Sequence, residues 1–300
     1  MTPSPLSEQA LGALEAQVQH AIATGDQSAL HLIGWGEVTV ALRLDTEQGS
    51  YACKRLPAFP DRAAAERCAR AIENYVAALT AKGLTVVPTT AHILESSREL
   101  RLYLVQPALP REQLGPNHFR NLPLAQVLRD FDRVADCIER TLDPTLAPDG
   151  QLANWAFDGE RILYLDVSTP FHKHADGTPT LEWKYFLGHL PAPLRSLAER
   201  KVLPALLDKY HELRPQMTDF AANLQKEKLE HLKAPIIARA NERFGFDPPI
   251  TEKEVRDYYR SDARTYAGIE SVRRFTQWTR VTLLRKPPAE LLPPRVDRNL

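Results

Sequence analysis

Alternating and helical hydrophobic patterns divide the first hundred residues into a sheet and two helices. Residues 7–23 place apolar side chains at helical spacing, and so do the alanine-rich residues 61–84. The apolar and β-branched runs between and after them predict strands separated by turns. The expected strands lie at residues 30–44, interrupted at Gly34 and Gly36, and at residues 51–54, 86–88, 91–94 and 100–105. We therefore expect a leading helix followed by a five-stranded sheet with one main helix.

The pattern changes after residue 105, where three prolines between residues 107 and 116 interrupt the chain. Helical periodicity then dominates, most clearly at residues 122–142 and again at residues 181–285. Between these stretches, an Asp-Gly pair at 158–159 separates two short apolar runs and predicts a β-hairpin. We expect an α+β fold of two lobes. The predicted lobes are a small antiparallel-sheet lobe at residues 1–107 and a larger, mainly helical lobe at residues 108–300.

Composition and charge narrow the possible partners. The 300-residue chain is 43% hydrophobic and 25% charged, which suits a large folded core. Its 38 basic and 38 acidic side chains balance, so no overall field would draw it to nucleic acid or to a membrane, and we expect neither as a partner. The three cysteines form no CxxC pair, and the first thirty residues contain no leader-like apolar segment, so a cytoplasmic location is expected.

One segment in the second half has the spacing of a phosphoryl-transfer loop. Asp149 and Asn154 are five residues apart, so a single loop would present a carboxylate to an acceptor hydroxyl and an amide oxygen to a metal ion. Asp166 follows Asn154 by twelve residues, at the end of the predicted hairpin. Since a hairpin returns the chain past its own start, we expect Asp166 to lie beside Asn154. Taken singly, each of these residues is more often a turn former or a helix cap.

The N-terminal part offers a cation and a glycine-containing turn. Lys54 lies among apolar neighbours in a predicted strand, where it either pairs with nucleotide phosphates or projects into water from an edge. Glu73, on the following predicted helix, is the expected partner of Lys54. Glu66 is its competitor, because seven residues place both on nearly one helical face. Gly34 and Gly36 could let backbone N–H groups approach phosphate, although such pairs are also common in hairpin turns.

Together these residues resemble the protein-kinase-like superfamily, and their pattern is closest to aminoglycoside phosphotransferases and other small-molecule kinases. The resemblance covers the chain from the first predicted strand to shortly after Asp166. It implies a bilobal fold with ATP bound at a hinge that includes Gln106 and Ala108. It also implies Asp149 as the catalytic residue, with Asn154 and Asp166 as ligands of Mg²⁺. No A-P-E sequence follows this segment, which favours a small-molecule acceptor over a protein substrate.

Two departures from the family pattern leave room for other functions. Ala147 stands where the family has a histidine two residues before the catalytic aspartate, and Val167-Ser168-Thr169 replaces the usual Phe-Gly. The chain could act as an ATP- and Mg²⁺-dependent phosphotransferase, or as a pseudokinase-type module that binds a nucleotide or a partner. A kinase-fold enzyme with other nucleotide chemistry, such as nucleotidyl transfer, is the third possibility.

A basic and aromatic cluster near residue 280 allows two interpretations. Arg273, Arg274, Trp278 and Arg280 could bind an anionic substrate, or they could belong to a solvated amphipathic helix with a buried tryptophan. The helical pattern favours the second interpretation.

Overall fold

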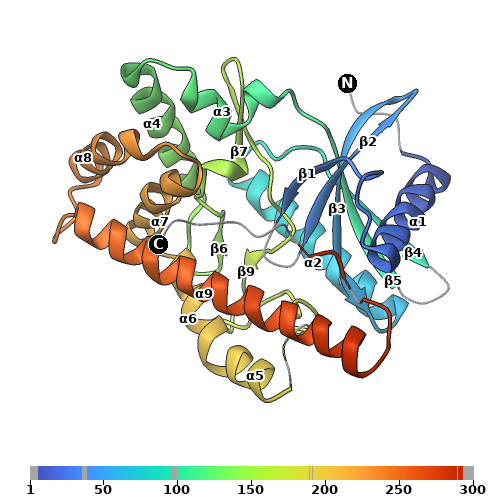
Figure 1. Cartoon of the computed structure of the whole chain (residues 1–300). Helices are drawn as coiled ribbons and strands as arrows, with labels where there is room; N and C mark the ends of the chain where they lie inside the picture. The colour runs from blue at the N-terminus through green and yellow to red at the C-terminus, as the bar shows by residue number, and fades with distance from the viewer. Residues whose placement is uncertain are drawn as a thin grey trace.

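A five-stranded antiparallel sheet forms the N-terminal part of the chain, and helices dominate the rest (Figure 1). The structure is a computed structural model and describes residues 6–35, 39–95, 100–188, 190, 192–288 and 290–292. The strand order is β1-β2-β3-β5-β4. The strand bounds are β1 Leu32–Trp35, β2 Val40–Thr46, β3 Gly49–Phe59, β4 Thr90–Glu95 and β5 Leu100–Pro107. This arrangement, with the helical part that follows, confirms the predicted α+β fold class.

The sheet separates two hydrophobic clusters, because successive side chains of a strand point to opposite faces. On the outer face, α1 (Glu8–Thr24) shares a buried cluster with Cys53 of β3. On the inner face, α2 (Arg62–Ala81) shares a cluster with Leu56 of β3 that continues into the C-terminal part. One face of the sheet is thus covered by the leading helix, and the other faces the remainder of the molecule.

Local sequence explains where the first two helices begin and where the first one ends. The Ser7 side chain caps α1 by accepting a hydrogen bond from the Ala10 amide at 3.2 Å. Asp61 does the same for α2 from the Ala64 amide at 2.7 Å. Gly25 ends α1 with φ of 79°, a left-handed conformation that glycine adopts without a steric penalty.

The C-terminal part is built around α7, a helix that is buried on most sides. The α-helices here are α3 Gly115–Arg120, α4 Leu124–Thr141, α5 Ala192–Leu197, α6 Leu203–Tyr210, α7 Leu213–Lys226, α8 Lys233–Phe244 and α9 Glu252–Trp278. The short turns of 3₁₀ or π helix are η1 Arg111–Gln113, η2 Leu152–Asn154, η3 Trp183–Tyr185, η4 Ala198–Val202, η5 Glu230–Leu232 and η6 Thr279–Leu283. The short strands are β6 Leu146–Ala147, β7 Trp155–Asp158, β8 Arg161–Tyr164 and β9 Phe171–His172.

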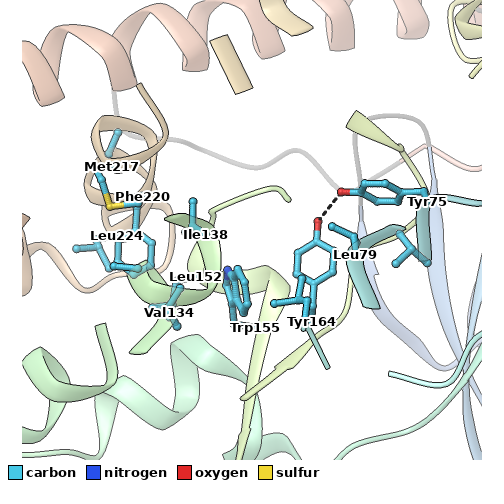
Figure 2. Packing of buried hydrophobic residues seen from close by; sticks show 14 of the residues in the cluster. Tyr75, Leu79, Val134, Ile138, Leu152, Trp155, Tyr164, Met217, Phe220 and Leu224 are labelled. Atoms are coloured by element: carbon cyan, nitrogen blue, oxygen red, sulfur yellow. Dashed lines mark hydrogen bonds between the residues drawn. The ribbon is translucent and has the colours of Figure 1, made fainter. Parts of the chain in front are cut away.

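One continuous core joins the two parts of the molecule. Figure 2 shows Met217 and Phe220 of α7 packed near side chains of α4, with Tyr75 of α2 and Tyr164 of β8 in the same cluster. In Figure 1, α9 runs from the C-terminal helices toward the sheet. None of the helices in the described ranges is long and apolar enough to cross a bilayer.

One predicted strand is absent from the sheet. Residues 86–88 were expected to form a strand, but Val86 makes only an isolated parallel bridge with Tyr164. The Val87 amide donates a hydrogen bond to the Tyr164 carbonyl at 2.9 Å, and the Tyr164 amide donates one to the Thr85 carbonyl at 2.8 Å. The segment therefore pairs with β8 of the C-terminal part instead of extending the N-terminal sheet.

Candidate active site

Lys54 and Asp166 form an ion pair between the inner face of the sheet and the C-terminal part. The Lys54 Nζ lies 2.7 Å from Asp166 Oδ1, and both side chains are partly accessible, at 23% and 28% exposure. Ser168 holds the same carboxylate oxygen with its amide at 2.9 Å and its hydroxyl at 2.7 Å. These contacts bring residues more than a hundred positions apart in sequence into one site.

The charge state of Asp166 follows from these contacts. Burial alone would raise its pKa, but the charge and hydrogen bond of Lys54, helped by Ser168, hold the pKa below the usual range of a carboxyl group. Asp166 is therefore ionised at neutral pH. A metal ion or phosphate that enters the site would meet a preformed carboxylate beside a preformed cation.

The loop between β6 and β7 lies next to Asp166, as the predicted hairpin requires. Leu165, the residue before Asp166, donates its amide hydrogen bond to the Asn154 carbonyl at 2.9 Å. Asp149 accepts a hydrogen bond from the Gln151 amide at 3.0 Å through Oδ1, which shapes the start of the loop. Asp149, Asn154 and Asp166 are thus assembled by one short stretch of chain.

Asp149 lies in an environment that disfavours its charge. Burial, and then the negative charge of Asp219, raise the pKa of Asp149 to about 7. Asp219 is itself buried in α7, and burial raises its pKa as well. A carboxyl group with a pKa near neutrality can give up and take back a proton at the working pH, which suits a general base.

Asp219 is a residue that the sequence analysis missed. It accepts a hydrogen bond from Asn223 Nδ2 at 2.9 Å, one turn further along α7. Gln216, on the same helix, is also buried, and its amide donates to the Tyr210 carbonyl at 2.6 Å. Gln216, Asp219 and Asn223 are spaced by three and four residues, which places them on one face of α7, and this spacing is a signal that could have identified Asp219.

Two tyrosines brace the loop around Ala147, the position at which the kinase-like pattern would have a histidine. The Tyr75 hydroxyl, from α2, donates to the Ala147 carbonyl at 2.7 Å and lies 3.5 Å from the Tyr164 hydroxyl (Figure 2). The Tyr164 hydroxyl in turn accepts a hydrogen bond from the Asp149 amide at 2.9 Å. Both tyrosines are fully buried. Side chains from α2 and β8 therefore support the backbone on both sides of residue 148, which the alanine side chain cannot do.

The expected hinge residues are engaged within the protein. Gln106 donates its side-chain amide to the Thr89 hydroxyl at 2.9 Å and to the Leu165 carbonyl at 2.8 Å. It thereby connects the end of β5 to the residue that precedes Asp166. The backbone N–H of Ala108 donates to the Ser50 carbonyl at 2.9 Å. The Ala108 N–H is therefore already hydrogen-bonded, and the base of a nucleotide bound here would have to contact other atoms of the hinge.

The expected pair between Lys54 and Glu73 does not form, and this part of the prediction is corrected. Glu73 is exposed on α2, because the buried face of that helix carries alanines, Cys68, Ile72 and Tyr75. The competing Glu66 lies 3.9 Å from Arg70 on its own helix. Lys54 is positioned by Asp166 instead.

The glycine pair of the predicted phosphate loop is only partly described. Gly34 lies within β1, paired with Ala41, and a methyl group at Gly34 would sit 3.7 Å from the Ala41 side chain, an ordinary contact. Its lack of a side chain is therefore not required by close packing. Gly36 lies outside the described residues.

The site fits a nucleotide and a metal ion better than it fits a closed metal centre. Within the described ranges no three His, Cys, Asp or Glu side chains converge to hold a metal. Mg²⁺ commonly uses one or two carboxylates with substrate phosphates, which matches a single ionised Asp166 beside Asn154. The cation of Lys54 lies on the same side of the sheet. Lys54 and Asp166 supply one charge of each sign, and the loop that carries Asn154 lies beside them.

Comparisons with known proteins place the chain in a family and show a weak structural likeness. The model of a family of unknown function, DUF6206, matches residues 13–277. No curated protein matches the chain. Two structures of the PknI kinase domain from Mycobacterium tuberculosis, one of them a point mutant, are similar at 16% identity and a TM-score of 0.31. The mutant covers 63% of this chain and 89% of its own, and the other covers 73% and 97%. Similarity at this level has no bearing on function.

Proposed function

This chain belongs to the DUF6206 family, whose function is unknown, and we propose that it is an ATP- and Mg²⁺-dependent phosphotransferase. Its acceptor would be a hydroxyl group of a small molecule. The observation that carries the proposal is the accessible ion pair of Lys54 and Asp166 at 2.7 Å, next to the loop of Asp149 and Asn154. A phosphoryl-transfer site needs a cation, metal ligands and a group that orients the acceptor, and these residues supply them.

Each residue has a distinct role in the proposal. Lys54 would exchange its contact with Asp166 for the α and β phosphates, and Asp166 and Asn154 would hold Mg²⁺. When bound, Mg²⁺ supplies positive charge that stabilises the phosphate oxygens during transfer. Asp149 would accept the proton of the acceptor hydroxyl, a role that its raised pKa of about 7 supports.

A second candidate is a pseudokinase-type module that binds a nucleotide without transferring phosphate. It is favoured by the exposed position of Glu73, which leaves Lys54 without the glutamate partner of active kinases. The tyrosine brace at Ala147 favours activity, because it supports the backbone of Asp149 without the histidine of the kinase-like pattern. We therefore rank the phosphotransferase first.

A titration of the purified chain with ATP, with and without Mg²⁺, tests the proposal. A ligand at a hundred times its dissociation constant stabilises a native protein by about 2.7 kcal/mol, which corresponds to a rise of roughly 5 °C in Tm for a chain of this size. We expect this rise only when Mg²⁺ is present. Asp166→Ala should lose the Mg²⁺-dependent rise and lower turnover of an accepted substrate by about a hundredfold or more.

The matched control is Asp257→Ala, which removes a carboxylate that is 50% exposed on α9 and forms an ion pair with Lys253. It should retain both the thermal shift and the turnover. Binding of Mg²⁺ and ATP without transfer to any hydroxyl acceptor would support the pseudokinase alternative. No shift with nucleotide in the wild type would exclude the phosphotransferase and the nucleotide-binding pseudokinase, and would leave a partner-binding module.

A further inference from the structure

The C-terminal end of α9 and the turn after it carry an exposed apolar surface. We call residues 275–286 the α9 tip; its exposed apolar side chains are Phe275 at 66%, Trp278 at 53%, Val281 at 42%, Leu283 at 64% and Leu284 at 59%. The rings of Phe275 and Trp278 stack with centroids 6.0 Å apart. The expectation of a buried tryptophan in this helix is therefore wrong. The remaining large apolar side chains that are exposed on the described surface are scattered over other elements.

The charge of the α9 tip is uniformly positive. Residues 275–286 include Arg280, Arg285 and Lys286 and contain no aspartate or glutamate. Arg285 and Lys286 are exposed and make no ion pair with any described residue. The nearest carboxylates in sequence, Glu270 and Glu290, are held by arginines that precede the tip. The positive charge is thus uncompensated next to the apolar side chains, although the whole chain is neutral.

We propose that the α9 tip binds the surface of an anionic lipid bilayer. Exposed Trp, Phe and Leu side chains beside Lys and Arg are the composition of segments that lie in the headgroup region of a membrane. The basic side chains would contact lipid phosphates or carboxylates, and the apolar ones would enter the acyl boundary. Figure 1 shows this end of α9 at the periphery of the molecule, below the sheet.

The shape of the surface favours a bilayer over a protein partner. The apolar side chains lie at a helix end and on the following turn, where residues 281–287 are all exposed, so no described part of the chain covers them or forms a groove around them. A bilayer accepts a protruding apolar group without a complementary groove, whereas a protein partner requires one. The neutral net charge made a membrane partner unexpected from the sequence, and the local charge of the tip changes that expectation.

Sedimentation of the full chain with vesicles tests the proposal. One set of vesicles contains phosphatidylcholine alone, and the other contains phosphatidylcholine with phosphatidylserine. We expect binding to the anionic vesicles that weakens as salt is added. Arg285→Glu with Lys286→Glu should reduce the affinity for anionic vesicles by about tenfold or more. Each basic residue near an anionic surface strengthens binding by roughly fivefold, and this variant removes two of them. Trp278→Ser with Leu283→Ser should also abolish or strongly reduce binding, because these side chains would no longer insert into the acyl region of the bilayer.

The matched control is Arg256→Glu with Arg260→Glu, which makes the same change of net charge at exposed positions near the other end of α9. It should bind as the wild type does, and unchanged circular dichroism confirms folding of all variants. Absence of binding to anionic vesicles overturns the proposal, as does binding that the control weakens as much as the tip variants. If Trp278→Ser with Leu283→Ser instead abolishes a dimer seen by size-exclusion chromatography, the surface is an interface between two copies.

Discussion

Two neighbouring residues of β3 form ion pairs on opposite faces of the sheet, and the two pairs differ in solvent exposure and in hydrogen-bond geometry. Lys54 faces inward and contacts Asp166, with 23% and 28% of the side chains exposed. Arg55 faces outward and contacts Glu15 of α1, with both side chains only 5% exposed. Arg55 donates from Nε at 2.8 Å and from its terminal nitrogen at 2.9 Å, so the second pair is bidentate.

This difference indicates that the Arg55 pair is a structural contact, whereas the Lys54 pair can be exchanged for contacts with a ligand. Glu15 also accepts hydrogen bonds from Tyr103 and Gln19, and although burial would raise its pKa, these contacts and Arg55 hold the pKa below the usual range. Such a pair is saturated, and removing one partner leaves a buried charge unpaired. The Lys54 pair is single and partly solvated, so a ligand can replace it at small cost.

The largest effect on stability is expected from breaking the buried pair. Arg55→Met leaves Glu15 as a buried carboxylate without its cation, and we expect the free energy of unfolding to fall by about 3–5 kcal/mol. Urea denaturation monitored by circular dichroism measures the change. In the double variant, Glu15→Leu with Arg55→Met, much of this loss should disappear, because neither member of the pair is then left buried without its partner.

Arg43→Met is the matched control for this comparison. Arg43 pairs with Asp45 at 2.9 Å, but the two side chains are 36% and 56% exposed. We expect a change below about 1 kcal/mol, as for exposed pairs in general. A loss as large as that of Arg55→Met would contradict the distinction between buried and exposed pairs.

A smaller effect, dependent on pH, is expected at the loop of the inner site. The folded chain holds the proton of Asp149 up to a pH of about 7, whereas the unfolded chain releases it near pH 4. The native state therefore binds more protons, and the contribution of Asp149 to stability is lost as pH rises from about 4 to about 7. Asp149→Asn cannot ionise and should be more stable than the wild type at pH 8, by on the order of 2 kcal/mol after allowance for partial exposure.

Denaturation at pH 5 and pH 8 checks this prediction. Asparagine retains the acceptor for the Gln151 amide, so the loop should keep its shape in the variant. The gain in the free energy of unfolding of Asp149→Asn over the wild type should be small at pH 5 and should reach its full value at pH 8. An equal difference at both pH values would show that Asp149 titrates in its ordinary range, and that Asp219 does not perturb it.

The parts of the site that are close in sequence could be predicted, since one hairpin determines their geometry. Asn154 and Asp166 are joined by β7 and β8, and the contact of Leu165 with Asn154 follows from that pairing. The β3 position of Lys54 followed from its apolar neighbours in the same way. The fold class was predictable too, because strand patterns are frequent up to the end of β5 and helical patterns dominate after it.

Contacts between distant segments were not predictable from spacing alone. Glu73 was assigned to Lys54 by its distance in sequence, yet the apolar stripe through Cys68, Ile72 and Tyr75 already turns Glu73 to solvent. The helix period of α2 therefore predicts an exposed Glu73. Tyr75 reaches Ala147 across 72 residues, and no local pattern in the sequence indicates that hydrogen bond.

The smallest effect on stability is expected for Lys54→Met, where the comparison between the two pairs becomes sharpest. Asp166 keeps its two hydrogen bonds from Ser168 and its access to water, so the free energy of unfolding should change by less than about 1 kcal/mol. The same variant should lose the thermal shift with Mg²⁺ and ATP, because the cation for the phosphates is gone. Denaturation of this one variant therefore measures the contribution of Lys54 to stability, and nucleotide titration measures its contribution to nucleotide binding. If Lys54→Met destabilises the chain as much as Arg55→Met, the inner pair is structural, and its proposed exchange for phosphate has to be abandoned.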